Sequence, residues 1–353
     1  MNYIIMATLT EASIIARKSI RYFIYGIIAI VILRGMLLTA ISIYKKVFPA
    51  PPPPPTVAFG KLSKVQFPEK TKHTINFSLE TPEGGLPTFP LTANVYFMPK
   101  TTSNLLSLDY AIDKAGRLGF DTTPEQTTES LYKFGNKNVP SSLTTNIITG
   151  SFSLSYDLNA DPTPISVKPP LPELARNSIK TYLSAATLYP KDLEDGTIES
   201  KYLKIQGGGF VSALSQSDAN LVRIDLFRKK YSDLPVVTAT PMEGNIWFMV
   251  SGIKDRGKEV LAGEYYYFPI DETKSSTYPI KTGDRAWQEL IANNYYPASL
   301  GTTIEGDNIK IRKVYLAYYD SGVYTEFFQP VYVFEGDKDF VGYIPAVTSE
   351  YSE

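Results

Sequence analysis

The sequence contains no cysteine and only one histidine, His73. Without cysteine the chain has no disulfides, no thiolate metal sites and no cysteine nucleophile. With a single histidine it also lacks the usual side chain for most proton-transfer and transition-metal chemistry. These absences remove several classes of enzyme, and we predict neither a metal site nor a cofactor.

An excess of charge is missing as well, because 35 basic side chains stand against 36 acidic ones. Binding to nucleic acid through a diffuse basic surface needs a clear positive excess. We therefore predict no nucleic-acid partner.

Apolar and aromatic residues are plentiful. The 353-residue chain is 43% apolar and includes 25 tyrosines. This composition is typical of a folded protein with one large core or two ordinary ones, and abundant tyrosine favours strand-rich packing.

The longest apolar run covers residues 22–44, with the sequence YFIYGIIAIVILRGMLLTAISIY. As a helix it would be about 34 Å long, enough to cross a hydrocarbon core of about 30 Å. The run is too long for a cleaved signal peptide and ends in Lys45 and Lys46 without a small-residue cleavage site. We predict a single-pass plasma-membrane protein with a cytoplasmic tail at residues 1–21 and the bulk of the chain extracytoplasmic.

Arg34 lies near the middle of this run. A cation there costs about 2.5–3.5 kcal/mol on insertion scales and often faces a partner or a polar cavity. Arg34 is therefore a candidate membrane contact for self-association or for a partner helix. The alternative is that its side chain extends toward the interface without any partner.

Proline marks two boundaries. Five consecutive prolines at residues 51–55 predict a stiff stalk over residues 45–58. Five more within residues 161–172 predict a linker between a first half at residues 59–160 and a second half at residues 173–353.

Both halves show an α+β pattern, with antiparallel sheets and a few packed helices. Helical spacing occurs at residues 108–118, 172–189 and 284–293, and we expect Gly119 to end the first helix and Thr282 to cap the third. Strands are predicted at residues 73–79, 91–97, 151–158, 221–228, 245–251, 259–270, 309–319, 324–334 and 340–347. Pro330 places its strand at an edge or a bulge.

Short motifs that suggest chemistry lack the context this chemistry needs. Ser251 and Lys254, with Lys281-Thr-Gly283, are similar to serine acylase signatures, but Ser251 ends a strand instead of opening a helix. Three other motifs indicate a strand end, a turn or bulge, and a hairpin tip: Asp157-x-Asn159-x-Asp161, Gly207-Gly208-Gly209, and the acidic group Glu335, Asp337 and Asp339. We predict no catalytic residue and no enzyme activity.

The segment AWQELIANNYYP, followed by IKIRKVYLAYYDSGVYTEFFQPVYVFEGD, resembles the C-terminal part of the YycH/YycI family, which is related to PepSY-like domains. The resemblance covers about residues 278–347. It implies one N-terminal transmembrane helix, an extracytoplasmic α+β portion, and a role in binding and restraining a sensor histidine kinase of the cell envelope. The family supplies no active-site residues.

These observations predict a non-enzymatic, membrane-anchored binding or regulatory protein of the cell envelope. Its partner would be another envelope protein, such as a sensor kinase. The alternatives are a structural subunit of an envelope assembly that self-associates and, in a third class, a hydrolase with two carboxylates. The candidate interaction surface consists of Trp287, Tyr315, Tyr318, Tyr319, Phe328 and Tyr332.

Overall fold

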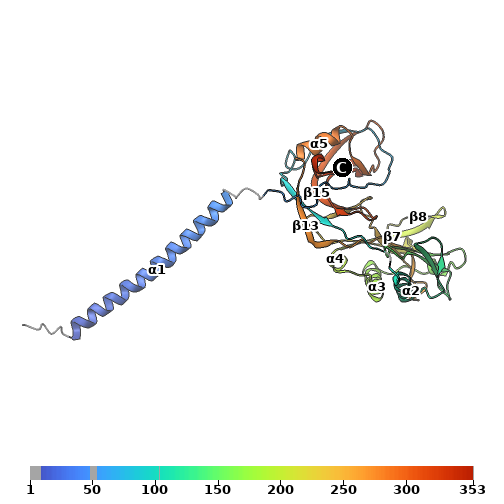
Figure 1. Cartoon of the computed structure of the whole chain (residues 1–353), viewed down its shortest axis with the longest axis horizontal. Helices are drawn as coiled ribbons and strands as arrows, with labels where there is room; N and C mark the ends of the chain where they lie inside the picture. Colours follow the sequence, from blue (N-terminus) through green and yellow to red (C-terminus); the bar gives the residue numbers. More distant parts are fainter. Residues whose placement is uncertain (1–8, 48–53, 103, 353) are drawn as a thin grey trace, which may run out of the picture. The chain divides into compact units, whose positions relative to one another are not determined.

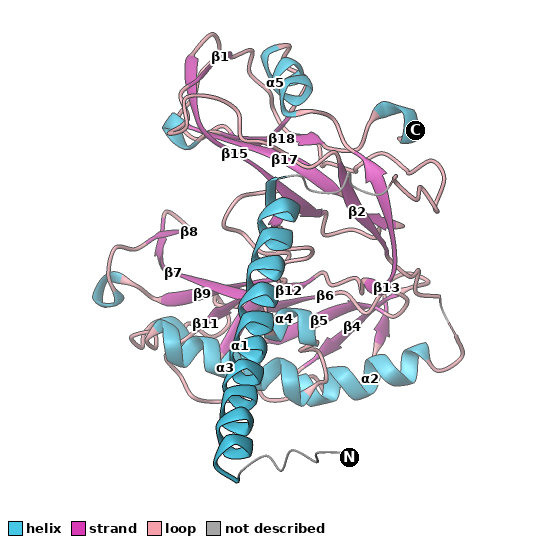
Figure 2. Ribbon diagram, turned by 90° about the vertical axis from the view of Figure 1, so that its left-hand side faces the viewer, coloured by secondary structure: helices cyan, strands magenta, loops and turns pink. Residues whose placement is uncertain are grey.

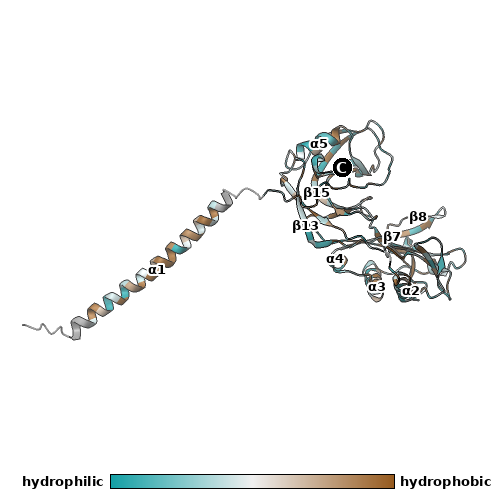
Figure 3. Cartoon of the chain, viewed as in Figure 1, coloured by the Kyte–Doolittle hydropathy of each residue, from teal (hydrophilic) through white to brown (hydrophobic). Residues whose placement is uncertain are grey.

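The computed structural model describes residues 9–47, 54–102 and 104–352, which form two separate units. The first holds one helix, α1 (Leu9–Val47), shown in Figure 1. Its 39 residues include the stretch Ser13–Tyr44, which is long and apolar enough to cross a membrane. Brown hydrophobic residues dominate this stretch in Figure 3, and Arg34 lies exposed within it. The helix begins before the predicted span, at Leu9, and ends after it, at Val47.

The second unit begins at Pro55. Of the predicted stalk, residues 45–47 belong to α1, residues 48–53 lie outside the described residues, and the chain from Thr56 onward lies against a strand of the second unit. The Val57 amide donates to the carbonyl of Thr277, and the hydroxyls of Thr56 and Ser276 lie 2.8 Å apart.

An antiparallel nine-stranded sheet forms one layer of this unit (Figure 2). In spatial order its strands are β3 (Glu125–Gln126), β4 (Leu131–Gly135), β5 (Ser141–Asn146), β6 (Phe152–Tyr156), β12 (Val260–Tyr265), β11 (Ile246–Val250), β9 (Leu221–Phe227), β7 (Thr197–Gln206) and β8 (Gly209–Ser212). β7 and β8 are joined by a tight turn in which Gly207 and Gly208 both have positive φ, as predicted for this glycine run.

Two helices cover one face of this sheet, α2 (Ser107–Leu118) and α3 (Pro172–Ala185) (Figure 2). Ala115 of α2 and Ile179 of α3 are buried in the same cluster as Phe248 of β11. Gly119 ends α2 in the left-handed conformation, as predicted. A short helix, α4 (Lys191–Glu194), follows α3.

A six-stranded sheet forms the other main layer. β1 (Asn76–Leu79), β15 (Asn308–Asp320), β17 (Pro330–Gly336), β18 (Val341–Pro345) and β14 (Tyr296–Ser299) lie in this order, and β10 (Val236–Thr238) also pairs with β15. β1 and β10 run parallel to β15, which departs from the predicted antiparallel pattern. Helix α5 (Gly283–Ile291) covers one face and is capped by Thr282, whose side chain accepts a hydrogen bond from the Arg285 amide.

A small antiparallel sheet completes the unit. It consists of β13 (Asp271–Pro279), β2 (Thr92–Phe97) and β16 (Phe327–Phe328). Within the described residues, 3₁₀ turns cover Thr163–Ile165, Gln216–Asp218, Asp337–Asp339 and Ser349–Tyr351. All three sheets contain strands from both sides of residues 161–172, so the two sequence halves exchange strands. The α+β class is confirmed.

The prediction for Pro330 was wrong in one respect. β17 is an interior strand, between β15 and β18, and not an edge strand. The proline fits because it is the first residue of β17, where its missing N–H removes no bond from the ladder. Its carbonyl accepts a hydrogen bond from the Ala346 amide.

Buried tyrosines give a test at alkaline pH. Burial raises the pKa of Tyr332 and of Tyr296 to about 12, and burial together with the charge of Glu305 raises that of Tyr295 to about 12. In the unfolded chain tyrosine ionises near pH 10. Below about pH 10 these tyrosines are protonated in both the folded and the unfolded state, so their contribution to stability is fully present. Between about pH 10 and 12 the tyrosines of the unfolded chain lose their protons first, which lowers the free energy of unfolding.

We therefore expect the urea midpoint of the full chain in detergent to be constant from pH 7 to about pH 9 and to fall steeply above about pH 10. Tyrosinate absorbance measured in parallel should rise with unfolding. A midpoint that stayed constant to about pH 11.5 would contradict this.

Candidate functional site

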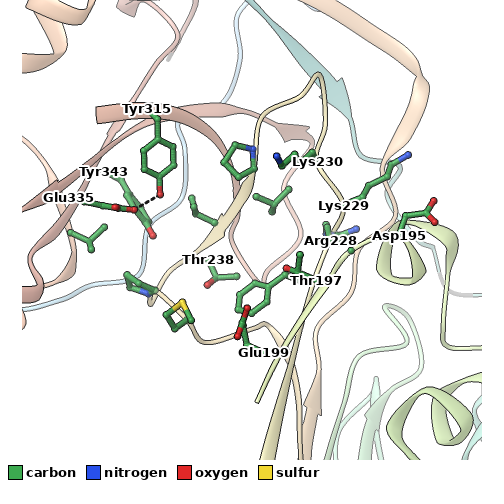
Figure 4. A pocket seen from close by; sticks show the side chains of 18 residues that line it. Asp195, Thr197, Glu199, Arg228, Lys229, Lys230, Thr238, Tyr315, Glu335 and Tyr343 are labelled. Carbon is green, nitrogen blue, oxygen red and sulfur yellow. Dashed lines mark hydrogen bonds between the residues drawn. The ribbon is translucent and has the colours of Figure 1, made fainter. Parts of the chain in front are cut away.

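A cleft of about 520 Å³ lies between the nine-stranded and the six-stranded sheets (Figure 4). One wall comes from β7, the end of β9 and the residues that follow it. The other wall comes from β10, β15, β17 and β18. Its apolar lining includes Phe227, Val236, Val237, Met242, Val341 and Tyr343. Pockets of about 300–1,000 Å³ with mostly apolar walls at such junctions are the usual places for ligands.

The local sequence explains why β10 is short. Before it, Ser232 and Asp233 adopt positive φ, and Tyr231 and Leu234 exchange both main-chain hydrogen bonds across this turn. After it, the Thr238 hydroxyl donates to the carbonyl of Glu243 and holds the following loop. The strand is thus confined between a tight turn and a fixed loop.

Tyr315 and Glu335 form a polar pair at one end of the cleft. The Tyr315 hydroxyl donates to Glu335 Oε1 at 2.6 Å, drawn as a dashed line in Figure 4. Burial raises the pKa of Tyr315 well above its ordinary value, and the bond to Glu335 adds to this. Lys313 lies over the Tyr315 ring, 4.3 Å from its centre. Tyr315 therefore remains a hydrogen-bond donor at neutral pH and does not act as a base.

Arg228 lies at the other end, in a buried ionic network. Its Nε donates to Asp320 Oδ2 at 2.6 Å, its Nη1 to Asp192 Oδ2 at 2.7 Å, and its Nη2 to the carbonyl of Phe268 at 2.7 Å. Burial lowers the pKa of Arg228, but the charges of Asp320 and Asp192 outweigh this and raise it overall. Because Arg228 directly follows β9 of the nine-stranded sheet and Asp320 ends β15 of the six-stranded sheet, their pairing joins the two main sheets.

The carboxylates of Asp192 and Asp320 are both bonded to Arg228, and neither lines the cleft. Asp192 also accepts hydrogen bonds from Tyr267 and Tyr231. This pair is therefore held in a structural role, and it gives the hydrolase alternative no acid and base at the cleft.

The motifs set aside in the sequence have structural roles. The Ser251 hydroxyl donates to the carbonyl of Lys258, so it is engaged in a turn. Asp161 pairs with Lys258 at 2.7 Å, and this contact lowers the pKa of the carboxyl group. His73 lies 3.4 Å from Glu305. Within residues 9–47, 54–102 and 104–352, no group of three or more acidic or histidine side chains is arranged to hold a metal ion.

The structure corrects most of the predicted interaction surface. Tyr318, Tyr319, Phe328 and Tyr332 are at most 4% exposed and belong to the core, so they form no surface. Tyr332 and Tyr319 are buried because both faces of the six-stranded sheet are covered, one by α5 and the other by the segment around Phe67. Tyr318 and Phe328 are buried together in a cluster with Tyr96 and Tyr231.

Two predicted surface residues are only partly buried. Trp287 packs on α5 against Phe334, and Tyr315 lines the cleft. The prediction missed the rest of the cleft, including Val236 and Met242. The available signal in the sequence was the pair Val236–Val237, between a turn and the loop that contains Pro241 and Met242. Two valines are too few to show the alternating pattern by which a strand is recognised.

A second exposed surface is the outer edge of the nine-stranded sheet. Among the described strands β8 pairs with β7 alone, and all four of its residues are exposed. Phe210 is 45% exposed, Val211 39%, and the following Leu214 is fully exposed. The unpaired main-chain groups of an exposed apolar edge strand can form hydrogen bonds with another chain.

The fold and cleft define an α+β protein with an apolar pocket between two sheets and an N-terminal helix long enough to cross a membrane. No protein-family model matches the chain, and no curated protein matches its sequence. One similar solved structure is an uncharacterized protein from Eubacterium rectale, with 10% identity, a TM-score of 0.41, and 79% of this chain and 89% of that one covered.

Another is YycH from Bacillus subtilis, with 12% identity and a TM-score of 0.35. The match covers 78% of this chain and spans 57% of YycH. Scores this low establish neither a shared fold nor a shared function.

Proposed function

We propose that this chain is a membrane-anchored, non-enzymatic binding protein of the cell envelope, which holds a segment of another envelope protein in the cleft between its two main sheets. Helix α1 would be the single plasma-membrane span, with the N-terminus cytoplasmic and the β-rich unit extracytoplasmic. Binding would regulate that partner, and the resemblance of residues 278–347 to the YycH/YycI family makes a sensor kinase the first partner to test.

The cleft is the observation that carries this proposal. Its walls are mainly apolar, and the polar pairs at its two ends are bonded within the chain: Tyr315 with Glu335, and Arg228 with Asp192 and Asp320. Glu199 and Lys230 also line it. A site with these properties can bury an apolar surface, whereas catalysis needs a group able to exchange protons with a substrate. The apolar stretch Ser13–Tyr44 supports the anchor.

Photocrosslinking in the native membrane tests the proposal. A benzoylphenylalanine probe would replace Met242, which lines the cleft and is 65% exposed. The matched control would carry the probe at Ile304, which is 67% exposed and lies outside the cleft. We expect a discrete crosslinked product containing another envelope protein from position 242 and none from position 304.

The identity of the product decides the outcome. Equal products from both positions would indicate random collision and contradict the proposal. A product consisting only of two copies of this chain would favour the structural, self-associating alternative. Capture of a sensor kinase at position 242 alone would support the regulatory role.

A further inference from the structure

β10 is an edge strand inside the cleft. It pairs with β15 on one side, with Val236 opposite Tyr318 and Thr238 opposite Asp320. Among the described residues no strand pairs with its other side. All three residues of β10 line the cleft, and Thr238 is labelled near the middle of Figure 4.

The main-chain groups on that free side can be identified from the ladder. The amide of Tyr318 donates to the carbonyl of Pro235 at 2.8 Å, so Pro235 faces β15. Main-chain groups alternate in direction along a strand, so Val237 also faces β15, while Val236 and Thr238 direct their N–H and C=O groups to the opposite side. Within the described part of the chain, these four groups have no hydrogen-bond partner across that side.

Side chains flank this free edge on both sides. Val237 packs with Tyr343 on one face of the strand, and Phe227 lines the wall from the nine-stranded sheet. The charges near the ends of the cleft are largely matched within the chain, since Lys229 lies 2.7 Å from Glu272 and Glu335 accepts from Tyr315. An occupant would therefore meet mainly apolar walls, the side chains of Glu199 and Lys230, and one row of main-chain donors and acceptors.

We propose that the cleft binds an extended, mainly aliphatic peptide segment, which adds to β10 as a further strand. This inference rests on the proposed function and names the conformation and chemistry of the bound segment. A peptide fits better than a small apolar molecule because it brings main-chain groups that match those of Val236 and Thr238, while its alternate side chains fill the apolar walls. The open side of β10 thus supplies affinity, and the walls supply selectivity.

The test begins with a random heptapeptide phage library, selected on the full chain in lipid nanodiscs and counter-selected on the Met242→Glu variant. The selected peptide would then be synthesised in three forms: unmodified, N-methylated at alternate residues on one edge, and N-methylated at alternate residues on the other edge. N-methylation removes amide donors and keeps the side chains. Affinities would be measured by fluorescence anisotropy on the full chain.

We expect one N-methylated form to bind about tenfold or more weakly and the other to bind within about twofold of the unmodified peptide, because only one edge meets β10. Val236→Pro, which removes the outward N–H and leaves the Pro235 carbonyl bonded to Tyr318, should weaken binding by a similar factor. Val236→Thr, which keeps that N–H, should not.

Equal affinity of both N-methylated forms would overturn strand addition, even if Met242→Glu still abolished binding and the cleft remained the site. A library that gave no peptide sensitive to Met242→Glu would also overturn it. Neither result depends on the photocrosslinking at position 242, whose failure alone would count against the proposed function. If Val236→Pro failed to fold, the comparison of the two N-methylated peptides would still test whether the peptide adds to β10 as a strand.

Discussion

Replacing Arg228 with methionine is expected to lower the free energy of unfolding by about 3–5 kcal/mol. Arg228 is 5% exposed and neutralises two buried carboxylates, Asp192 and Asp320. Without the guanidinium these carboxylates lose their charge partner and two short hydrogen bonds, and burying an unpaired charge is costly. The measurement is urea denaturation of the full chain in detergent at pH 7, followed by near-ultraviolet circular dichroism.

The matched control is Arg117→Met. Arg117 pairs with Asp113 one turn earlier on α2, and both side chains are more than half exposed. Its loss should change stability by about 0.5 kcal/mol or less. A triple variant with Arg228→Met, Asp192→Leu and Asp320→Leu should recover stability relative to Arg228→Met alone, because it leaves no buried charge. Equal effects of the two single arginine variants would show that the network contributes little.

Tyr332→Ala is expected to cost about 3–5 kcal/mol, the range found for large aromatic side chains removed from a core. Tyr332 is completely buried in β17. Its ring meets that of Phe89 edge-on with centres 5.0 Å apart, and its hydroxyl donates to the carbonyl of Lys281. Alanine would leave a cavity and an unpaired carbonyl. The same denaturation measurement applies.

Tyr110→Ala provides the comparison for this second variant. Tyr110 lies on α2 and is 58% exposed. Alanine has the better helix propensity, so we expect a change within about 0.5 kcal/mol. A small effect of Tyr332→Ala would instead support the prediction that Tyr332 belongs to an exposed interaction surface.

The helices and most strands could be predicted because their signals are local. Residues 107–118 repeat apolar side chains at helical spacing and end at Gly119, and Thr282 is a standard N-cap. Strands such as β9 and β15 are rich in branched and aromatic residues.

β5 and β13 were missed because they are rich in serine and threonine, and β7 because charged residues interrupt it. Their pairing partners, not their own side chains, stabilise them as strands.

The site could not be predicted in the same way. A run such as that in β17 is apolar because both faces of its sheet are covered, and the sequence alone does not distinguish this from an exposed aromatic surface. The cleft joins Thr197 on β7, Val236 on β10 and Tyr343 on β18, which are far apart in the chain. All three belong to the second sequence half, and they come together only because β7 pairs into the nine-stranded sheet while β10 and β18 belong to the six-stranded one.

The attachment of the chain at Thr56 has a mechanical consequence. A pulling force transmitted along the chain from α1 enters the β-rich unit where Val57 bonds to Thr277 and the Phe59 amide bonds to the Tyr278 hydroxyl. These contacts all lie on β13, which belongs to the small three-stranded sheet. The cleft is lined by the other two sheets, and Glu272 of β13 reaches it through its ion pair with Lys229, so tension on the anchor would load β13 before it reached the cleft.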